Sequence, residues 1–269
     1  MTPASELLEL ALEIALEAGE LAHRRRREGV TIAATKSALA DIVTEADREV
    51  EALVRRRIAE ARPDDGFLGE EGGADQGTSG IAWVVDPIDG TVNYAYGIPA
   101  WAVSIAAVAL PEGAPEPDTA TWTALAGVVY NPVVGQVFRA SRGGGAWLGD
   151  TPLHVNDETG PAGALLGTGF GYDPATHAAA LALQAKIMPI ARDVRRIGAA
   201  SLDLAYVAAG RLDGYYERGL QPWDHAAASL LVTEAGGVVG GSPGGVPGRE
   251  MTIAAGPGLF PRLSALVGE

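Results

Sequence analysis

The residues best suited to do chemistry lie at the end of an apolar run in the first third of the chain. Residues 83–85, Trp-Val-Val, lead into Asp86 and Asp89, two carboxylates three residues apart. Two ionised carboxylates about 4 Å apart repel by roughly 4 kcal/mol at an effective dielectric constant near 20, so a proton or a cation has to lie between them. The backbone N–H groups of Gly90 and Thr91 follow directly, and such donor clusters receive phosphate oxygens. The pattern predicts a metal-assisted phosphate site.

The same stretch indicates how these acids are positioned. Residues 81–85 are short and rich in β-branched side chains, as in a buried strand, which puts the acids at its C-terminal end. Pro87 cannot donate to a β-ladder, so we expect strand pairing to stop there. Asp-Gly at 89–90 permits a tight turn with positive φ. Because Asp-Pro and Asp-Gly are also common in plain turns, the rest of the chain has to decide between the two interpretations.

Acidic residues at the ends of two other predicted elements extend the pattern. Glu70 and Glu71 stand in Gly-Glu-Glu-Gly after Phe-Leu, and Asp224 stands in Trp-Asp-His at the start of an alanine-rich helical pattern. Taken singly, the glutamates are typical of a solvated loop and Asp224 of a helix N-cap. Only their combination with Asp86 and Asp89 indicates a shared site.

Several sequence blocks together resemble the signature blocks of the inositol monophosphatase family, in order and with the expected separations. They are Glu-Glu at 70–71, Trp-Val-Val-Asp-Pro-Ile-Asp-Gly-Thr at 83–91, Trp-Asp-His-Ala-Ala-Ala at 223–228 and Glu-Ala-Gly-Gly at 234–237. The resemblance extends to Asp-Ile-Val-Thr-Glu-Ala-Asp at 41–47 and Tyr-Tyr-Glu-Arg-Gly at 215–219. It therefore covers nearly the whole chain.

The resemblance implies the metal ligands and the reaction. Glu70, Asp86 and the carbonyl of Ile88 would hold one Mg²⁺, and Asp86, Asp89 and Asp224 a second; a third, weaker ion near Glu70 is common in the family. The candidate ligands are all oxygen atoms, with no Cys or His at matching positions, which favours Mg²⁺, with Mn²⁺ as a substitute, over Zn²⁺. The implied reaction is direct hydrolysis of a phosphomonoester by a metal-activated water, without a phosphoenzyme.

The resemblance also implies roles for residues around the metals. Thr91 would orient the attacking water with Thr44 or Asp47, and the turn at 198–200 and Glu217 match positions that contact the hydroxyl-bearing ring of the substrate. Simpler interpretations stay open. Helix capping alone explains Thr44 and Asp47, the start of a helix explains the turn at 198–200, and the end of a strand explains Glu217. The implied substrate-binding set is Asp89, Gly90, Thr91, Gly198, Ala199, Ala200, Glu217 and Asp224.

His225 follows Asp224 and invites a general-acid role. Consecutive residues on a helix point about 100° apart, and the metals already account for catalysis, so we expect no such role.

Composition and charge exclude several classes of function. The 269 residues include no Cys, so disulfides, thiolate metal sites and a cysteine nucleophile are excluded, and a cytoplasmic protein is expected. A formal net charge of −14 argues against nucleic acid as the main partner. The basic cluster 24–27 ends the first helical pattern, where cations complement the negative helix end. No targeting segment and no uncharged run of 18 apolar residues is present, so no membrane partner is expected.

Periodicity predicts alternating blocks of helices and strands. We expect helices at 5–27, 45–61, 174–187, 201–209, 222–234 and 259–267, and strands at 81–85, 102–110, 124–130, 136–140, 165–168, 213–217, 237–240 and 251–255. A capping box at 44–47 starts the second helix, the strands between 102 and 140 form an antiparallel meander, and 240–248 is a loop rather than a linker. Such blocks indicate a layered α/β or α+β architecture, and the resemblance implies the five-layer αβαβα sandwich of the sugar phosphatases. We expect one catalytic domain over 1–269 with two tightly joined halves, about 1–150 and 151–269.

The substrate is less constrained than the chemistry. Residues 92–105 most resemble the inositol-monophosphatase branch, which predicts hydrolysis of inositol 1-phosphate and related inositol and sugar monophosphates, lithium sensitivity and a homodimer. Histidinol-phosphate phosphatase is the main alternative, followed by fructose 1,6-bisphosphatase or NADP phosphatase of the same family. A non-enzymatic regulatory scaffold that binds a protein partner is the alternative from another class. Dehalogenase-type phosphatases and P-loop enzymes are excluded, because neither Asp-x-Asp nor Gly-x-x-x-x-Gly-Lys occurs at the site.

Overall fold

The structure is a computed structural model that describes residues 2–29, 32–35, 42–114, 116–157 and 163–268. Asp41, the first residue of the block at 41–47, lies outside these ranges. Within them, no helix is both long and apolar enough to cross a lipid bilayer.

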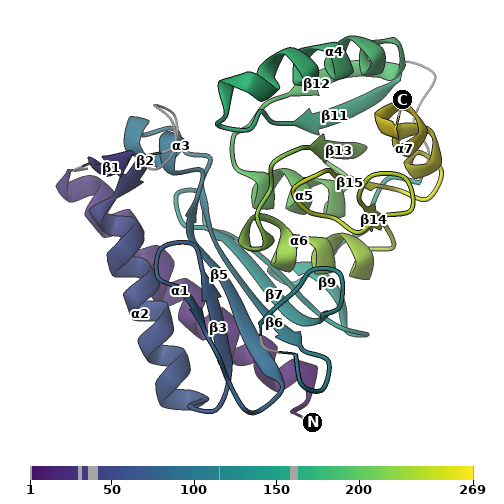
Figure 1. Ribbon diagram of the computed structural model, residues 1–269. Coiled ribbons are helices and arrows are strands. Elements are labelled where there is room, and N and C mark those ends of the chain that lie inside the picture. Colours follow the sequence, from purple (N-terminus) through teal and green to yellow (C-terminus); the bar gives the residue numbers. More distant parts are fainter. Residues whose placement is uncertain (1, 30–31, 36–41, 115, 158–162, 269) are drawn as a thin grey trace.

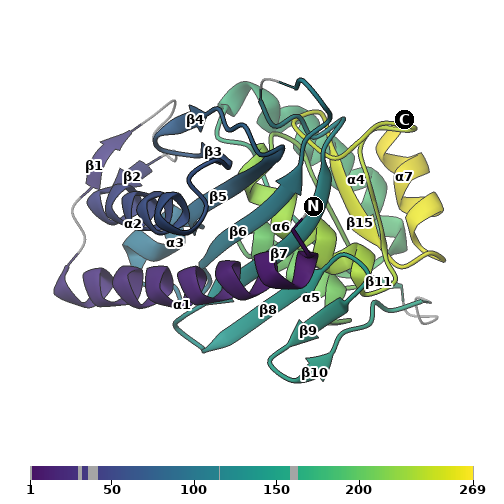
Figure 2. The same cartoon turned by 90° about the horizontal axis from the view of Figure 1, so that it is seen from below.

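Five layers stack in the order helix, sheet, helix, sheet, helix (Figure 1). The first layer is α1 (Ala4–Glu28) with α2 (Glu45–Ala61), which cover one face of an eight-stranded sheet (Figure 2). The middle layer is α5 (Ala200–Ala208) with α6 (Pro222–Glu234), and the last is α4 (His177–Ile187) with α7 (Phe260–Gly268) outside a five-stranded sheet. This arrangement confirms the predicted layered α/β fold.

The eight-stranded sheet has the order β10-β9-β8-β7-β6-β5-β3-β4. Its strands are β3 (Gly66–Gly69), β4 (Gly73–Asp75), β5 (Ile81–Asp89), β6 (Ala102–Ala109), β7 (Thr123–Asn131), β8 (Gln136–Ser141), β9 (Gly145–Leu148) and β10 (Thr151–Pro152). Strands β5 to β10 pair antiparallel in sequence order, which confirms the predicted meander, while β3 runs parallel to β5. The parallel pair brings the C-terminal ends of β3 and β5 to the same edge of the sheet.

The five-stranded sheet has the order β12-β11-β13-β15-β14. Its strands are β11 (Ala164–Thr168), β12 (Ala191–Arg195), β13 (Gly214–Glu217), β14 (Val238–Gly240) and β15 (Thr252–Ala255). Strand β11 is parallel to both neighbours, and β14 pairs antiparallel with β15 across the segment 241–251. The Gly/Pro-rich stretch is therefore a loop inside one sheet, as predicted. The remaining short elements are β1 (Ile32–Thr35), β2 (Ile42–Thr44), α3 (Thr91–Tyr96), η1 (Pro174–Thr176) and η2 (Met188–Ile190).

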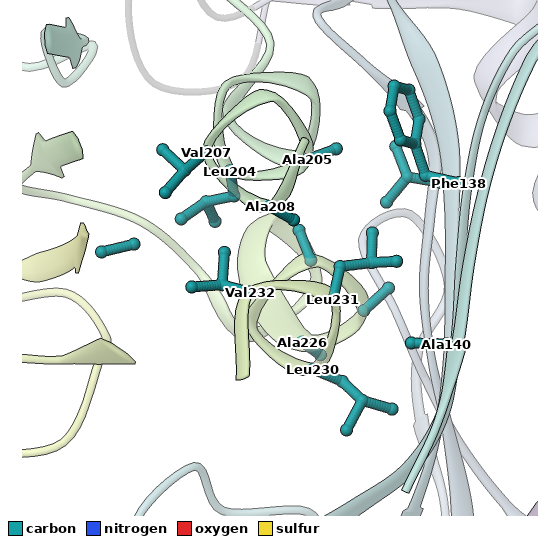
Figure 3. Packing of buried hydrophobic residues seen from close by; sticks show 14 of the residues in the cluster. Phe138, Ala140, Leu204, Ala205, Val207, Ala208, Ala226, Leu230, Leu231 and Val232 are labelled. Carbon is teal, nitrogen blue, oxygen red and sulfur yellow. The ribbon is translucent and has the colours of Figure 1, made fainter. Parts of the chain in front are cut away.

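The middle helices share one apolar core with both sheets (Figure 3). Leu231 points toward Phe138 and Ala140 of β8, while Val207 and Val232 point toward the second sheet (Figure 3). Helix α6 lies unusually close to β7, since a Cβ on Gly127 would be 2.8 Å from the backbone oxygen of Ala227. This close packing fixes the height of α6, and thus of its N-terminus, above the first sheet.

Two predicted elements differ from the structure. The segment 174–187 begins as the 3-10 turn η1 before α4 starts at His177, because Asp173 caps a turn that contains Pro174. Strand β5 continues to Asp89 instead of ending at 85. The elements that were not predicted are the strands β1, β2, β3, β4, β9, β10 and β12, the short helix α3 and the 3-10 turn η2.

Candidate active site

The C-terminal end of β5 carries the two central acids on an irregular ladder. Asp86 pairs with Ser104 of β6, the register then shifts, and pairing resumes between Asp89 and Ala102. The expectation that pairing stops at Pro87 is therefore wrong. An irregularity in the register leaves residues without a ladder partner, so it accommodates a proline that lacks an N–H. Inside it, Asp86 Oδ1 accepts a hydrogen bond of 3.0 Å from the N–H of Ile88.

Gly90 forms the turn from β5 into α3. It has φ 90° and ψ 41°, the left-handed conformation expected for Asp-Gly. A Cβ at this position would lie 3.0 Å from the carbonyl oxygen of Gly198 and 3.1 Å from that of Ala100. Glycine therefore allows the turn at 198–200 to approach the end of β5, and the structure brings these two predicted segments together.

Asp89 joins this turn to α5. Its Oδ1 accepts the N–H of Ala200 at 3.1 Å, and its Oδ2 accepts the N–H of Ser201 at 2.8 Å together with the Ser201 hydroxyl. Asp89 thus satisfies N–H groups at the start of α5 in place of a local N-cap residue. Sequence reasoning missed Ser201, since nothing in the local pattern indicates a partner 112 residues away.

Asp47 serves both as a helix cap and as a neighbour of Thr91. Its Oδ2 accepts the N–H of Thr44 at 2.8 Å and the Thr44 hydroxyl, which completes the predicted capping box of α2. Its Oδ1 lies 3.2 Å from Thr91 Oγ1, which is also 3.1 Å from the carbonyl oxygen of Ile88. Burial raises the pKa of Asp47 to about 6. The capping interpretation of Asp47 is confirmed, and the same side chain contacts Thr91, while its role in catalysis stays a prediction.

Asp224 and Glu70 approach the same region from α6 and from the β3–β4 turn. Asp224 lies in the first turn of α6, and its Oδ2 accepts the N–H of Gln221 at 2.7 Å. Glu70 directly follows β3 and is partly buried instead of fully solvated. Both acids raise the pKa of Asp86, so the structure places them within electrostatic reach of it.

The acids at this edge destabilise one another when ionised. Burial, and then repulsion from Glu70, Asp89 and Asp224, raise the pKa of Asp86 well above its ordinary value. Burial and then Asp89 and Glu70 do the same to the pKa of Asp224. The pKa of Asp89 is raised to about 6, chiefly by burial, although its hydrogen bonds from Ser201 and Ala200 oppose the rise.

A hard divalent cation fits this donor set. The candidate ligands are carboxylate oxygens plus the carbonyl of Ile88, the ligand types that Mg²⁺ and Mn²⁺ prefer, and positive charge would relieve the mutual repulsion. Among the described residues, no three acidic or histidine side chains already converge on one point. Which of these acids bind a metal ion therefore stays a prediction.

Glu217 lies at the end of β13, beside the turn and α5. Its carboxylate accepts the hydroxyl of Tyr215, and a Cβ on Gly169 would lie only 2.0 Å from its Oε2. Burial raises the pKa of Glu217 to about 7, against the influence of Tyr215 and Arg196. Asp203 of α5, missed by sequence reasoning, is 1% exposed, and neither carboxylate oxygen has a hydrogen-bond partner among the residues that the structure describes.

His225 is buried beneath the site. It is 1% exposed, its Nδ1 lies 3.5 Å from Ser229 Oγ, and burial lowers its pKa to about 4. The imidazole is therefore neutral at physiological pH. Its lack of a catalytic role stays a prediction.

Three arginines of the basic cluster 24–27, Arg25, Arg26 and Arg27, lie in the last turn of α1, where cations complement the helix dipole. Arg25 there pairs with Glu28 at 2.7 Å and with Glu49 at 2.6 Å.

An αβαβα fold with carboxylates gathered at the end of a central strand is that of a phosphatase. The model of the inositol monophosphatase family matches residues 4–266, and the chain belongs to that family. It is 42% identical to inositol-1-monophosphatase of Mycobacterium leprae, over 95% of this chain and 91% of that protein. It is 37% identical to Nus factor SuhB of Haemophilus influenzae, over 87% and 84%. The crystal structure of extragenic suppressor protein suhB from Bartonella henselae superposes with a TM-score of 0.88 at 34% identity, covering 98% of this chain and 99% of that one.

Proposed function

We propose that this phosphatase hydrolyses inositol 1-phosphate and related polyol monophosphates and that it requires Mg²⁺. The observation that carries the proposal is the electrostatic proximity of acids from three separate elements: Glu70, Asp89 and Asp224 raise the pKa of Asp86, and Asp89 and Glu70 raise that of Asp224. The name of the Mycobacterium leprae relative, inositol-1-monophosphatase, supports the substrate class.

The ligand assignment is the one that the resemblance to the family implies, and oxygen donors of this kind suit Mg²⁺. Glu70, Asp86 and the carbonyl of Ile88 would hold one ion, and Asp86, Asp89 and Asp224 a second, with a third weaker ion near Glu70. When bound, such ions lower the pKa of water and neutralise charge on the phosphate and the leaving oxygen.

The residues of the chain then orient the reactants. The hydroxyl of Thr91 donates a hydrogen bond shared between Asp47 Oδ1 and the carbonyl oxygen of Ile88, so the lone pairs of Thr91 Oγ1 would accept a hydrogen bond from the attacking water. The N–H groups of Gly90 and Thr91 at the start of α3 would donate to the phosphate. The turn at 198–200 lies against Gly90 and would form the adjoining wall.

Glu217 would recognise the alcohol part of the substrate. Its carboxylate accepts the hydroxyl of Tyr215, and Asp89 raises its pKa, which supports a position close to the site. A carboxylate with spare lone pairs accepts hydrogen bonds from ring hydroxyls. A site built in this way rejects substrates that leave it unpaired.

A phosphate-release panel tests the proposal. Inositol 1-phosphate, histidinol phosphate, fructose 1,6-bisphosphate and NADP are compared at equal Mg²⁺, and inositol 1-phosphate should have the highest kcat/KM. Activity should vanish in EDTA and return with Mg²⁺. Activity that survives exhaustive chelation would overturn the metal mechanism, and a higher kcat/KM for histidinol phosphate would overturn the substrate.

Lithium sensitivity and dimerisation belong to the same proposal. Li⁺ at millimolar concentration should inhibit, since it would compete with Mg²⁺ for one of the carboxylate positions. Light scattering at micromolar concentration should give a homodimer in which each chain is one catalytic domain. A monomer would remove the dimer and leave the chemistry intact.

A regulatory role is the second candidate function. The name of the Haemophilus influenzae relative, Nus factor SuhB, denotes a role other than hydrolysis. Asp224→Asn separates the two: a regulatory function in cells that survives this change, while phosphate release is lost, would show that regulation is independent of catalysis.

A further inference from the structure

A buried glutamate of α2, outside the ligand set, holds the turn that carries Glu70. Glu51 is 3% exposed, and its carboxylate spans two successive N–H groups of the β3–β4 turn. Oε2 accepts the N–H of Glu71 and Oε1 the N–H of Gly72, both at 2.7 Å. A carboxylate is costly to bury unless charge-assisted hydrogen bonds compensate, and these two bonds do so.

The first of these bonds fixes the backbone of Glu70. The N–H of Glu71 belongs to the peptide group that begins with the carbonyl of Glu70. Anchoring that peptide plane to Glu51 sets the direction in which the Glu70 side chain leaves the turn. Without this bond the plane would be free to rotate, and the Glu70 carboxylate would sample more positions relative to Asp86.

The glycines on either side of the two glutamates, Gly69 and Gly72, leave space for the Glu51 carboxylate. A Cβ on Gly69 would lie 2.4 Å from Glu51 Oε2, and one on Gly72 would lie 2.6 Å from Oε1. Real Cβ atoms do not approach an oxygen so closely, so glycine at both positions allows the backbone to reach the carboxylate. The Gly-Glu-Glu-Gly sequence is thus matched to a carboxylate beneath it.

Arg55 completes the support. Arg55 lies one turn after Glu51 on α2. Its Nη2 lies 3.3 Å from Glu51 Oε1 and donates to the carbonyl oxygen of Gly73 at 3.1 Å. Its guanidinium lies 4.1 Å from the ring centroid of Phe67 in β3. Hydrogen bonds with the Glu51–Arg55 pair therefore hold the turn between β3 and β4 in place.

The same face of α2 supports the other side of the site. Asp47 and Glu51 are four residues apart, so they lie one above the other on the helix. Asp47 contacts Thr91 at the start of α3, while Glu51 contacts the turn after β3. One rigid helix therefore sets the distance between the Thr91 side of the site and Glu70.

We propose that Glu51 is a positioning residue that raises the Mg²⁺ affinity of the site by orienting Glu70. This rests on the proposed role of Glu70 as a metal ligand. Residues that orient metal ligands change metal affinity by about 10- to 100-fold when they are replaced.

The test is calorimetric titration of Mg²⁺ into metal-stripped protein, well below the unfolding temperature. Glu51→Gln keeps the shape but offers one acceptor oxygen in place of two, so Mg²⁺ affinity should fall about tenfold or more. Glu60→Gln is the matched control, because Glu60 is an exposed residue of the same helix, 3.9 Å from Arg56, and its change should leave the affinity within about twofold.

The double variant with Glu70→Gln separates positioning from general destabilisation. If Glu51 acts through Glu70, Glu51→Gln has no further effect on Mg²⁺ affinity once Glu70 is replaced. Losses that multiply in the double variant, or wild-type affinity in Glu51→Gln, would overturn the inference. Wild-type affinity in Glu70→Gln would show instead that the ligand assignment is wrong.

Glu51→Asp keeps the test decisive if Glu51→Gln does not fold. Aspartate retains the charge but is one methylene shorter, so it cannot reach both N–H groups in the present backbone. Its Mg²⁺ affinity should fall in the wild-type background and not in the Glu70→Gln background. Unchanged affinity in Glu51→Asp would contradict the proposal.

Discussion

Replacing Asp86 by Asn should stabilise the metal-free protein while it disables the metal-loaded one. Asp86 is 2% exposed, and its pKa is raised well above the ordinary value by burial and by Glu70, Asp89 and Asp224. Asn has nearly the same shape, keeps an acceptor for the N–H of Ile88 and carries no charge. The variant therefore removes a repulsion without removing the hydrogen bond at 3.0 Å.

The size of the effect can be worked from the neighbouring acid. Asp89 has several hydrogen bonds that favour its ionised form, yet its pKa still rises from 3.8 to about 6. A rise of about two units corresponds to about 3 kcal/mol at a pH well above both values. The pKa of Asp86 is raised in the same direction, by burial and by its acidic neighbours, so ionising Asp86 also costs the fold free energy. We expect Asp86→Asn to increase the free energy of unfolding in EDTA at pH 8, by about 1 kcal/mol or more.

The stability difference between the variant and the wild type should depend on pH. A carboxyl whose pKa is raised in the folded state binds its proton more tightly there than in the unfolded chain. Its stabilising contribution is complete below about pH 4 and is lost as the pH rises through the raised value. The difference between the variant and the wild type should thus be close to zero at pH 4 and grow toward pH 8.

Urea unfolding in EDTA at pH 4, 6 and 8 measures the difference. Asp150→Asn is the control, since Asp150 is fully exposed and 3.9 Å from Arg139, and it should change stability by less than about 0.5 kcal/mol. Saturating Mg²⁺ should stabilise the wild type more than the variant, because the variant lacks a ligand. A variant that is less stable than the wild type in EDTA at pH 8, or a difference that does not vary with pH, would refute the reasoning.

Three further predictions concern the site and its support. Asp224→Asn should lower kcat by about a hundredfold or more, whereas His225→Ala should lower the unfolding temperature and reduce kcat by less than about tenfold. If His225→Ala reduced kcat more than Asp224→Asn in folded protein, the assigned roles would be wrong. KM for inositol 1-phosphate should fall as the pH rises through about 7, where Glu217 ionises, and Glu217→Gln should abolish this dependence; a loss confined to histidinol phosphate would favour that substrate instead. Gly127→Ala should displace Ala227 by about half an ångström, lower the free energy of urea unfolding by about 1–3 kcal/mol and, through the shift of α6, weaken Mg²⁺ binding. Unchanged stability would contradict the close packing of α6 on β7.

Local patterns predicted the elements that are long or strongly alternating. The helical period of 5–27 and 45–61 appears as α1 and α2, and the capping box at 44–47 is present, because these signals depend only on residues within a few positions. Strand β4 is three exposed residues and β12 is largely exposed, so neither has the apolar alternation that marks a strand. Helix α3 has six residues, too few for a helical period to be recognised.

The candidate site likewise has features that the local sequence predicts and features that depend on distant segments. The acids of β5 and the positive φ of Gly90 follow from the sequence between 83 and 91, whereas the partners of those acids come from distant segments. Asp89 accepts the N–H of Ser201, 112 residues later in the chain, and Glu51 lies 20 residues before the N–H of Glu71, which it accepts beside Glu70. Each is an ordinary polar residue in its own segment, and only the layering of α2 and α5 on the sheets gives it a role.

The bond between Asp89 and the start of α5 also has a consequence for synthesis of the chain. Ala200 is made 111 residues after Asp89, which at about 5–20 residues per second is a delay of about 5–20 seconds. Until then the buried carboxylate has no partner from α5, and the first sheet lacks the helices that cover its second face. A nascent chain that stops before residue 200 lacks Asp224 and the turn at 198–200, so it should not form the complete site. It should also expose the apolar inner face of the sheet, which makes it a target for chaperones and proteases.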